Sequence, residues 1–171
     1  MARARSRPVR IGLLVAAVVA GGVTLRSSLL RADRGPEKGG DAARVVPFET
    51  LPSNHMVVRA KLNGKGPYRL VFDLGSPVTL LAGKAAEQSG AIPKDAPRSF
   101  LFGVRGEGKV ESLELGELTA RDVPVVVMDH PALKALGGLL GKPLDGILGY
   151  TFFARYRTTL DYQAKTLAFT P

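Results

Sequence analysis

The chain contains no cysteine and only two histidines among its 171 residues. The absence of cysteine excludes disulfide bonds, a thiolate nucleophile and any zinc site with cysteine ligands. Because histidine is also scarce, we expect no metal site, and no motif in the sequence calls for another cofactor. The fold must therefore depend on packing, for which a hydrophobic content of 45% is sufficient. The length suits one ordinary domain with a tail.

Positive charge is concentrated at the N-terminal end. Residues 1–44 contain nine Lys and Arg against three Asp and Glu, so this tail carries +6 of the formal net charge of +9. Only +3 remains for residues 45–171. A nucleic-acid-binding domain would carry a basic stripe on its folded part, so we expect no nucleic-acid partner.

The N-terminal segment has the layout of an export signal. Four arginines precede an uncharged run over residues 11–25 that is rich in Val, Leu and Ala. At 1.5 Å per residue this run is about 22 Å long, short of the ~30 Å core of a bilayer. A cleaved signal peptide and an uncleaved anchor through residues 9–30 both remain open. We expect residues 1–30 to direct export, residues 31–44 to form a linker, and the domain to face outside the cytoplasm, either anchored or secreted.

From residue 45 onward, short β-type runs broken by Gly, Pro and Asn predict a small all-β domain. A hairpin turn is expected over residues 63–66, where glycine supplies positive φ. Two short helices are expected, over residues 83–89 with Gly90 as the stop, and over residues 131–136 with Gly137 past the end. The expected strands cover residues 55–62, 68–73, 78–81, 99–104, 110–115, 118–128, 158–162 and 166–169.

The most informative stretch delivers one carboxylate from an apolar strand into a glycine-containing turn. Leu70, Val71 and Phe72 precede Asp73, and a second apolar strand leaves the turn. A charge at the end of an apolar run needs partners or a function, because its burial is costly. An isolated Asp-x-Gly is most often only a turn cap, so the wider context decides the interpretation.

That context resembles the active-site loop of retropepsin-like aspartic peptidases, with Asp73 followed by Leu74, Gly75 and Ser76. A second match lies downstream, where Ile147, Leu148 and Gly149 resemble the family's apolar-apolar-Gly motif, followed by a short helix and a closing strand. The resemblance covers residues 45–171. It implies a closed all-β barrel with one or two short helices, in which the second motif packs beneath the catalytic loop.

The resemblance also implies the chemistry. Asp73 would be the catalytic carboxylate, and two copies of the chain would pair to hydrolyse bonds in a peptide or protein substrate, because the reaction needs two carboxylates that share one proton. Asp145 is read as a turn residue of the structural motif. The family's flap over the substrate would fall near Phe102, Gly103, Val104, Gly106 and Gly108, although an ordinary flexible hairpin there stays open.

Three positions depart from the family pattern. Leu74 replaces the usual Thr or Ser, whose hydroxyl helps to lock the two loops of the dimer together. Pro77 and Tyr150 stand where retroviral members have an acid and an arginine that pair with each other. The sequence therefore leaves two alternatives to the aspartic endopeptidase: a catalytically silent module that dimerises and binds peptides, and a membrane-tethered structural domain without a ligand.

Overall fold

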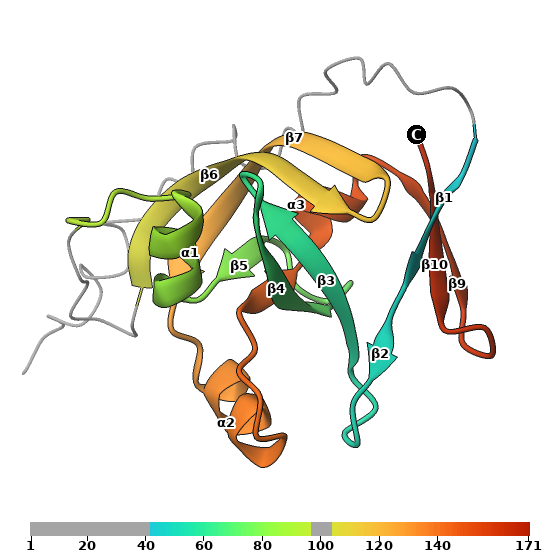
Figure 1. Ribbon diagram of the computed structural model, residues 1–171, viewed down its shortest axis with the longest axis horizontal. Helices are drawn as coiled ribbons and strands as arrows, with labels where there is room; N and C mark the ends of the chain where they lie inside the picture. Colours follow the sequence, from blue (N-terminus) through green and yellow to red (C-terminus); the bar gives the residue numbers. More distant parts are fainter. Residues whose placement is uncertain (1–41, 97–103) are drawn as a thin grey trace, which may run out of the picture.

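The computed structural model describes residues 42–96 and 104–171, which form two β-sheets and three short helices (Figure 1). The predicted export segment, almost all of the predicted linker, and predicted flap residues Phe102 and Gly103 lie outside this part of the chain. Within residues 42–96 and 104–171, no helix combines the length and the apolar character needed to cross a membrane. The elements are β1 (Arg44–Pro47), β2 (Glu49–Thr50), β3 (Met56–Leu62), β4 (Lys65–Phe72), β5 (Thr79–Leu81), α1 (Gly83–Ser89), β6 (Val104–Leu115), β7 (Leu118–Met128), α2 (Pro131–Leu139), β8 (Gly146–Leu148), α3 (Tyr150–Phe153), β9 (Arg157–Asp161) and β10 (Thr166–Thr170).

The larger sheet closes into a barrel. Its strands follow the order β2-β3-β4-β8-β5-β7-β6, and an additional pairing joins β3 to β6. Six strands from β3 to β6 thereby form a ring, with β2 attached outside it by pairing to β3. The prediction of a closed all-β barrel is confirmed. Closure also removes the open sheet edges that invite pairing with other chains.

The barrel strands show the alternation that a half-buried sheet requires. In β7, Val123, Val125 and Val127 are buried while the residues between them are more exposed. This period of two places every second side chain in the core. Strand β6, which pairs with β7, begins at Val104 and is therefore longer than the strand predicted over residues 110–115. Residues 99–103 of the other strand predicted here lie outside the described part of the chain.

The hairpin between β3 and β4 turns over two residues. Asn63 and Gly64 both have positive φ, 52° and 73°, as a tight type I′ turn requires. Lys65 and Gly66 already belong to β4, so the predicted four-residue turn is too long. The turn prediction is correct in place and wrong in extent.

Helix α1 has the predicted bounds, and Gly90 ends it with a φ of 80°. Helix α2 runs past Gly137 to Leu139, so the prediction that Gly137 ends it is wrong. A Cβ at Gly137 would lie 3.2 Å from Lys142 O, which shows that glycine there permits close packing of the following loop. The positive φ of 60° comes later, at Gly141.

A three-stranded sheet of order β1-β10-β9 forms beside the barrel (Figure 1). The sequence patterns did not predict β1 or β2, because strands of four and two residues are too short to show a period. The third helix, α3, has four residues and is the short helix that the family resemblance implied.

Candidate active site

The Asp73 loop connects two strands that flank a third. Strand β4 leads into the loop and strand β5 follows it. Strand β8 lies between them, parallel to β4 and antiparallel to β5. Phe72, the last residue of β4, is in register with Leu148, the last residue of β8. The two predicted motifs, which lie about 75 residues apart in sequence, are therefore direct neighbours in the barrel.

The backbone of the loop fixes the Asp73 carboxylate. Asp73 Oδ1 accepts a hydrogen bond from the Gly75 N–H at 2.8 Å, and Asp73 N–H donates to Leu148 O at 3.1 Å. Ser76 N–H donates to Asp73 O at 3.3 Å, which closes the turn. The side chain is half-buried at the surface of the barrel. An acceptor bond from a backbone amide leaves the second carboxylate oxygen for a substrate or a water molecule.

Gly149 lets the second motif approach the loop closely. A Cβ at this position would lie 2.1 Å from Val78 O and 2.9 Å from Ser76 O, both of which are backbone atoms. The next residue, Tyr150, donates its N–H to Ser76 O at 2.9 Å. The end of β8 and the start of α3 thus support the Asp73 loop from beneath, as the resemblance implied for this motif.

A buried pair of threonines joins the outgoing strand to α3. Thr79 is fully buried and Thr151 is 4% exposed. Thr151 Oγ1 accepts the Thr79 N–H at 2.9 Å and donates to Thr79 Oγ1 at 3.0 Å, while Thr79 Oγ1 also accepts the Gly149 N–H at 3.3 Å. These bonds satisfy buried polar groups that would otherwise be costly. They tie the loop to its support within a single chain.

Aromatic side chains fill the core below this support. Phe72 and Phe153 have ring centroids 4.6 Å apart, and Phe152 contacts Phe153 and Phe169 at 5.4 and 5.6 Å, all with edge-to-face geometry. Such pairs contribute about 0.5–1.5 kcal/mol beyond their buried area. The end of β4 is therefore anchored to α3 and β10.

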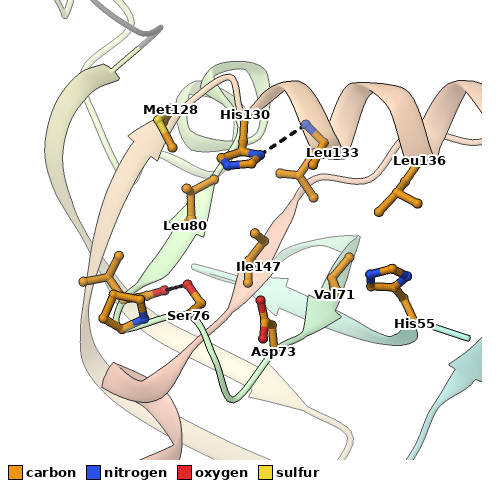
Figure 2. A pocket seen from close by; sticks show the side chains of 13 residues that line it. His55, Val71, Asp73, Ser76, Leu80, Met128, His130, Leu133, Leu136 and Ile147 are labelled. Carbon is orange, nitrogen blue, oxygen red and sulfur yellow. Dashed lines mark hydrogen bonds between the residues drawn. The ribbon is translucent and has the colours of Figure 1, made fainter. Parts of the chain in front are cut away.

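Asp73 lies at the border of a groove of about 370 Å³. Figure 2 shows Val71, Leu80 and Ile147 between Asp73 and α2, with Leu133 and Leu136 projecting from that helix. The lining is mainly apolar, and its polar members include Asp73, Ser76 and both histidines of the chain. The groove can accept an extended ligand whose apolar side chain lies beside the Asp73 carboxylate.

Comparison with known families decides the classification, because the family described as aspartyl protease matches residues 58–152, more than half of the chain. The chain belongs to the aspartyl protease family. The matched region contains the Asp73 loop, β6, β7, the Ile147–Gly149 motif and all of the groove lining except His55.

Two solved structures are similar to the chain. A retropepsin-like aspartic protease from Rickettsia conorii is 14% identical, with a TM-score of 0.50, and the match covers 74% of this chain and 88% of that one. The retroviral protease-like domain of Ddi1 from Leishmania major is also 14% identical, with a TM-score of 0.43 over 68% of this chain and 91% of that domain. The first likeness supports the retropepsin-like fold. No curated protein sequence matches the chain.

The structure brings together most of the predicted site of this member of the aspartyl protease family. Asp73, Leu74, Gly75 and Ser76 form one turn, and Ile147, Leu148 and Gly149 lie beside and beneath it. Asp145 lies away from this turn and holds the strands together, since its Oδ2 accepts the Arg69 N–H at 2.8 Å. It directly precedes β8, where the sequence predicted a turn residue.

The described part of the predicted flap is a paired strand. Val104, Gly106 and Gly108 all belong to β6, which pairs with β7 along its length, and none of them lines the groove. Gly108 packs closely against the loop that follows α1, since a Cβ at this position would lie only 2.6 Å from Ala91 O. Gly106 has a φ of 118° at a register shift between the two strands. The described part of the predicted flap thus belongs to a β-hairpin with β7, and its role as a cover over the substrate stays a prediction.

Sequence reasoning missed the two histidines and the α2 residues that line the groove. His130 is the N-cap of α2, where its Nδ1 accepts the Ala132 N–H at 3.2 Å. His55 precedes β3 and His130 follows β7, so each lies at the end of a barrel strand. The parallel pairing of β5 with β7 places the end of β7 beside the end of β5, and no local sequence pattern indicates this pairing.

Proposed function

We propose that the chain is an aspartic endopeptidase whose active site is assembled from two copies of Asp73, one from each subunit of a homodimer. The observation that carries this proposal is the Asp73 carboxylate itself, fixed by Gly75 N–H at the border of an apolar groove. Each chain supplies one such loop. The second carboxylate must then come from a second chain, related by a two-fold axis.

Two carboxylates about 3 Å apart cannot both ionise, so they share one proton. The ionised carboxylate removes a proton from a water molecule, and that water attacks the scissile carbonyl. The protonated carboxylate donates to the carbonyl oxygen, and the tetrahedral intermediate then collapses with release of the amine. This chemistry uses carboxylates and water and requires no cofactor.

Exposed apolar side chains beside the loop support pairing at this surface. Leu74 is 63% exposed and Tyr150 is 51% exposed, and their segments are joined by the bond from Tyr150 N–H to Ser76 O. Large apolar side chains clustered on a surface mark places where another molecule binds. In the dimer, apolar contact between the two Leu74 side chains across the axis would take the place of the hydroxyl groups that usually lock the two loops together.

The substrate would be an extended peptide or protein segment lying in the groove. We further propose that residues 1–30 carry the domain out of the cytoplasm, and that residues 9–30 tether it to the membrane where the segment is not cleaved. Tethering would raise the local concentration of chains and favour pairing. A reporter fused to residues 1–30 should then appear in the membrane or exported fraction, and a soluble cytoplasmic reporter would contradict this address.

The test replaces Asp73→Asn, which keeps the shape of the side chain and removes its ability to act as a base. Wild-type protein should cleave members of a peptide library between pH 3 and 7, and the variant should cleave none while unfolding at the same temperature. Mixing variant into wild-type chains should reduce activity by forming mixed dimers. Activity per chain should also rise with protein concentration and then saturate.

Two outcomes would contradict the proposal. Activity per chain that stays constant at concentrations where sedimentation shows only monomer would refute the shared site. Dimerisation and peptide binding without any cleavage would favour the silent binding module, which the exposed Leu74 at the place of the usual hydroxyl supports.

A further inference from the structure

Both histidines of the chain lie on the groove beside Asp73. They come from different parts of the sequence: His55 directly precedes β3, and His130 directly precedes α2. Figure 2 shows His130 on the α2 side, across the groove from Asp73, while His55 borders the groove near Val71. Among the thirteen lining residues, these two imidazoles and Asp73 are the ionisable groups.

The hydrogen bond at the start of α2 determines how His130 can meet a ligand. Its Nδ1 accepts the Ala132 N–H at 3.2 Å, so this nitrogen carries no proton. The neutral ring then carries its proton on Nε2, which becomes a donor. His55 Nδ1 is likewise engaged, 3.0 Å from Ser53 Oγ. His130 therefore offers an imidazole N–H donor on the α2 side of the groove, across from the Asp73 carboxylate.

The remainder of the groove is mainly apolar. Val71, Leu80 and Ile147 form its floor, and Leu133 and Leu136 form its α2 wall. A volume of about 370 Å³ accommodates a large side chain. An occupant must thus combine a bulky apolar group for the floor with an acceptor for His130.

We propose that the groove selects a substrate segment in which a bulky apolar residue beside the scissile bond is followed or preceded by an acidic residue that accepts a hydrogen bond from His130 Nε2. This inference rests on the proposed peptidase function and names its substrate class. A carboxylate suits the position better than an amide, because hydrogen bonds to charged acceptors are about twice as strong as neutral ones. The acidic side chain lies on the α2 side, away from Asp73.

The experiment uses the full-length chain and a matched set of fluorogenic peptides. Each peptide has Phe or Leu at the scissile bond and carries Glu, Gln or Lys at one neighbouring position. At one position, kcat/KM should be about fivefold higher for Glu than for Gln, and lower again for Lys. The His130→Asn variant should reduce the Glu-to-Gln ratio to about one, since asparagine can still cap the helix but its shorter side chain does not reach the position of His130 Nε2.

Lys134→Gln is the matched control. Lys134 is an exposed cation on the same helix and does not line the groove, so its removal should leave the ratio unchanged. A Glu preference that persists in His130→Asn, or that disappears in Lys134→Gln, would overturn the assignment to His130. If wild-type protein shows no preference for Glu over Gln, the proposed acidic substrate class is wrong, whatever the variants show.

A binding measurement separates this inference from the peptidase proposal. The dissociation constants of the same peptides are measured on the Asp73→Asn chain by fluorescence anisotropy, where no cleavage is needed. Glu-selective binding that depends on His130, together with no cleavage by wild-type protein, would support the groove assignment and refute the peptidase. Equal cleavage and equal binding of Glu and Gln peptides would support the peptidase and refute the selectivity.

Discussion

Gly149 connects the stability of the barrel to the geometry of the Asp73 loop, and the substitution Gly149→Ala tests this connection. The backbone at Gly149 has φ −110° and ψ −169°, a conformation open to alanine. Any effect of the added methyl group is therefore steric. The group would lie 2.1 Å from Val78 O, 2.6 Å from Val78 C and 2.9 Å from Ser76 O.

The size of the effect follows from these contacts. Ordinary contact begins at 3.4 Å, so the Val78 carbonyl and the methyl group must separate by about 1.3 Å. All three contacted atoms belong to the backbone of the loop, which cannot rotate away as a side chain could. Overpacking of this kind costs about 1–3 kcal/mol or more, and we expect the upper end of that range. A displacement of about 1 Å at a catalytic group lowers activity by roughly 10²-fold.

The assay combines thermal unfolding with peptide cleavage. Gly149→Ala should unfold roughly 10 °C below the wild type and lose about 10²-fold in kcat/KM. Gly138→Ala is the control, because a Cβ at this exposed helical glycine meets nothing within 4 Å. It should be neutral or more stable by up to about 1 kcal/mol, since alanine favours the helix. A Gly149→Ala variant that unfolds like the wild type and keeps its activity would refute the claim that β8 supports the loop sterically.

Three further predictions address the site and its surroundings. Thr151→Val should lower the free energy of unfolding, measured by urea denaturation, by about 1–3 kcal/mol, because the buried Thr79 N–H loses its acceptor. Thr151→Ser keeps the hydroxyl and should lose less, so equal losses in the two variants would argue against the hydrogen bond. Hydrogen bonding from Arg59 lowers the pKa of Glu49 below 4.5, so this pair stabilises the fold above that pH and the contribution disappears as pH falls through the lowered value. Glu49→Gln should thus cost only about 0.5 kcal/mol at pH 7, because the pair is partly exposed, and nothing at pH 2; a constant difference across this range would exclude the ion pair as its cause. Cleavage should follow a bell-shaped pH profile with its maximum below neutrality, reporting two macroscopic constants of the Asp73 pair, and a rate that only rises through pH 8 would exclude a shared proton.

Local patterns predicted most individual elements. The bounds of α1 and β7 agree with the structure, because each has a clear period and a glycine or turn at its end. One error arose where glycine has a packing role. Gly137 reads as a helix end, yet it lies within α2 and permits a close approach of the following loop. Sequence alone does not distinguish these two uses of glycine.

The sequence by itself determined the all-β class, the single Asp73 loop and its partner motif at Ile147–Gly149, because these depend on residue types at fixed spacing along the chain. Only the tertiary structure decided how β8 inserts between β4 and β5, that β3 and β6 close the barrel, and that His55 and His130 border one groove with Asp73. The reason is physical: these features arise from pairing between strands distant in sequence, and the register of such pairs is selected by packing of the whole core.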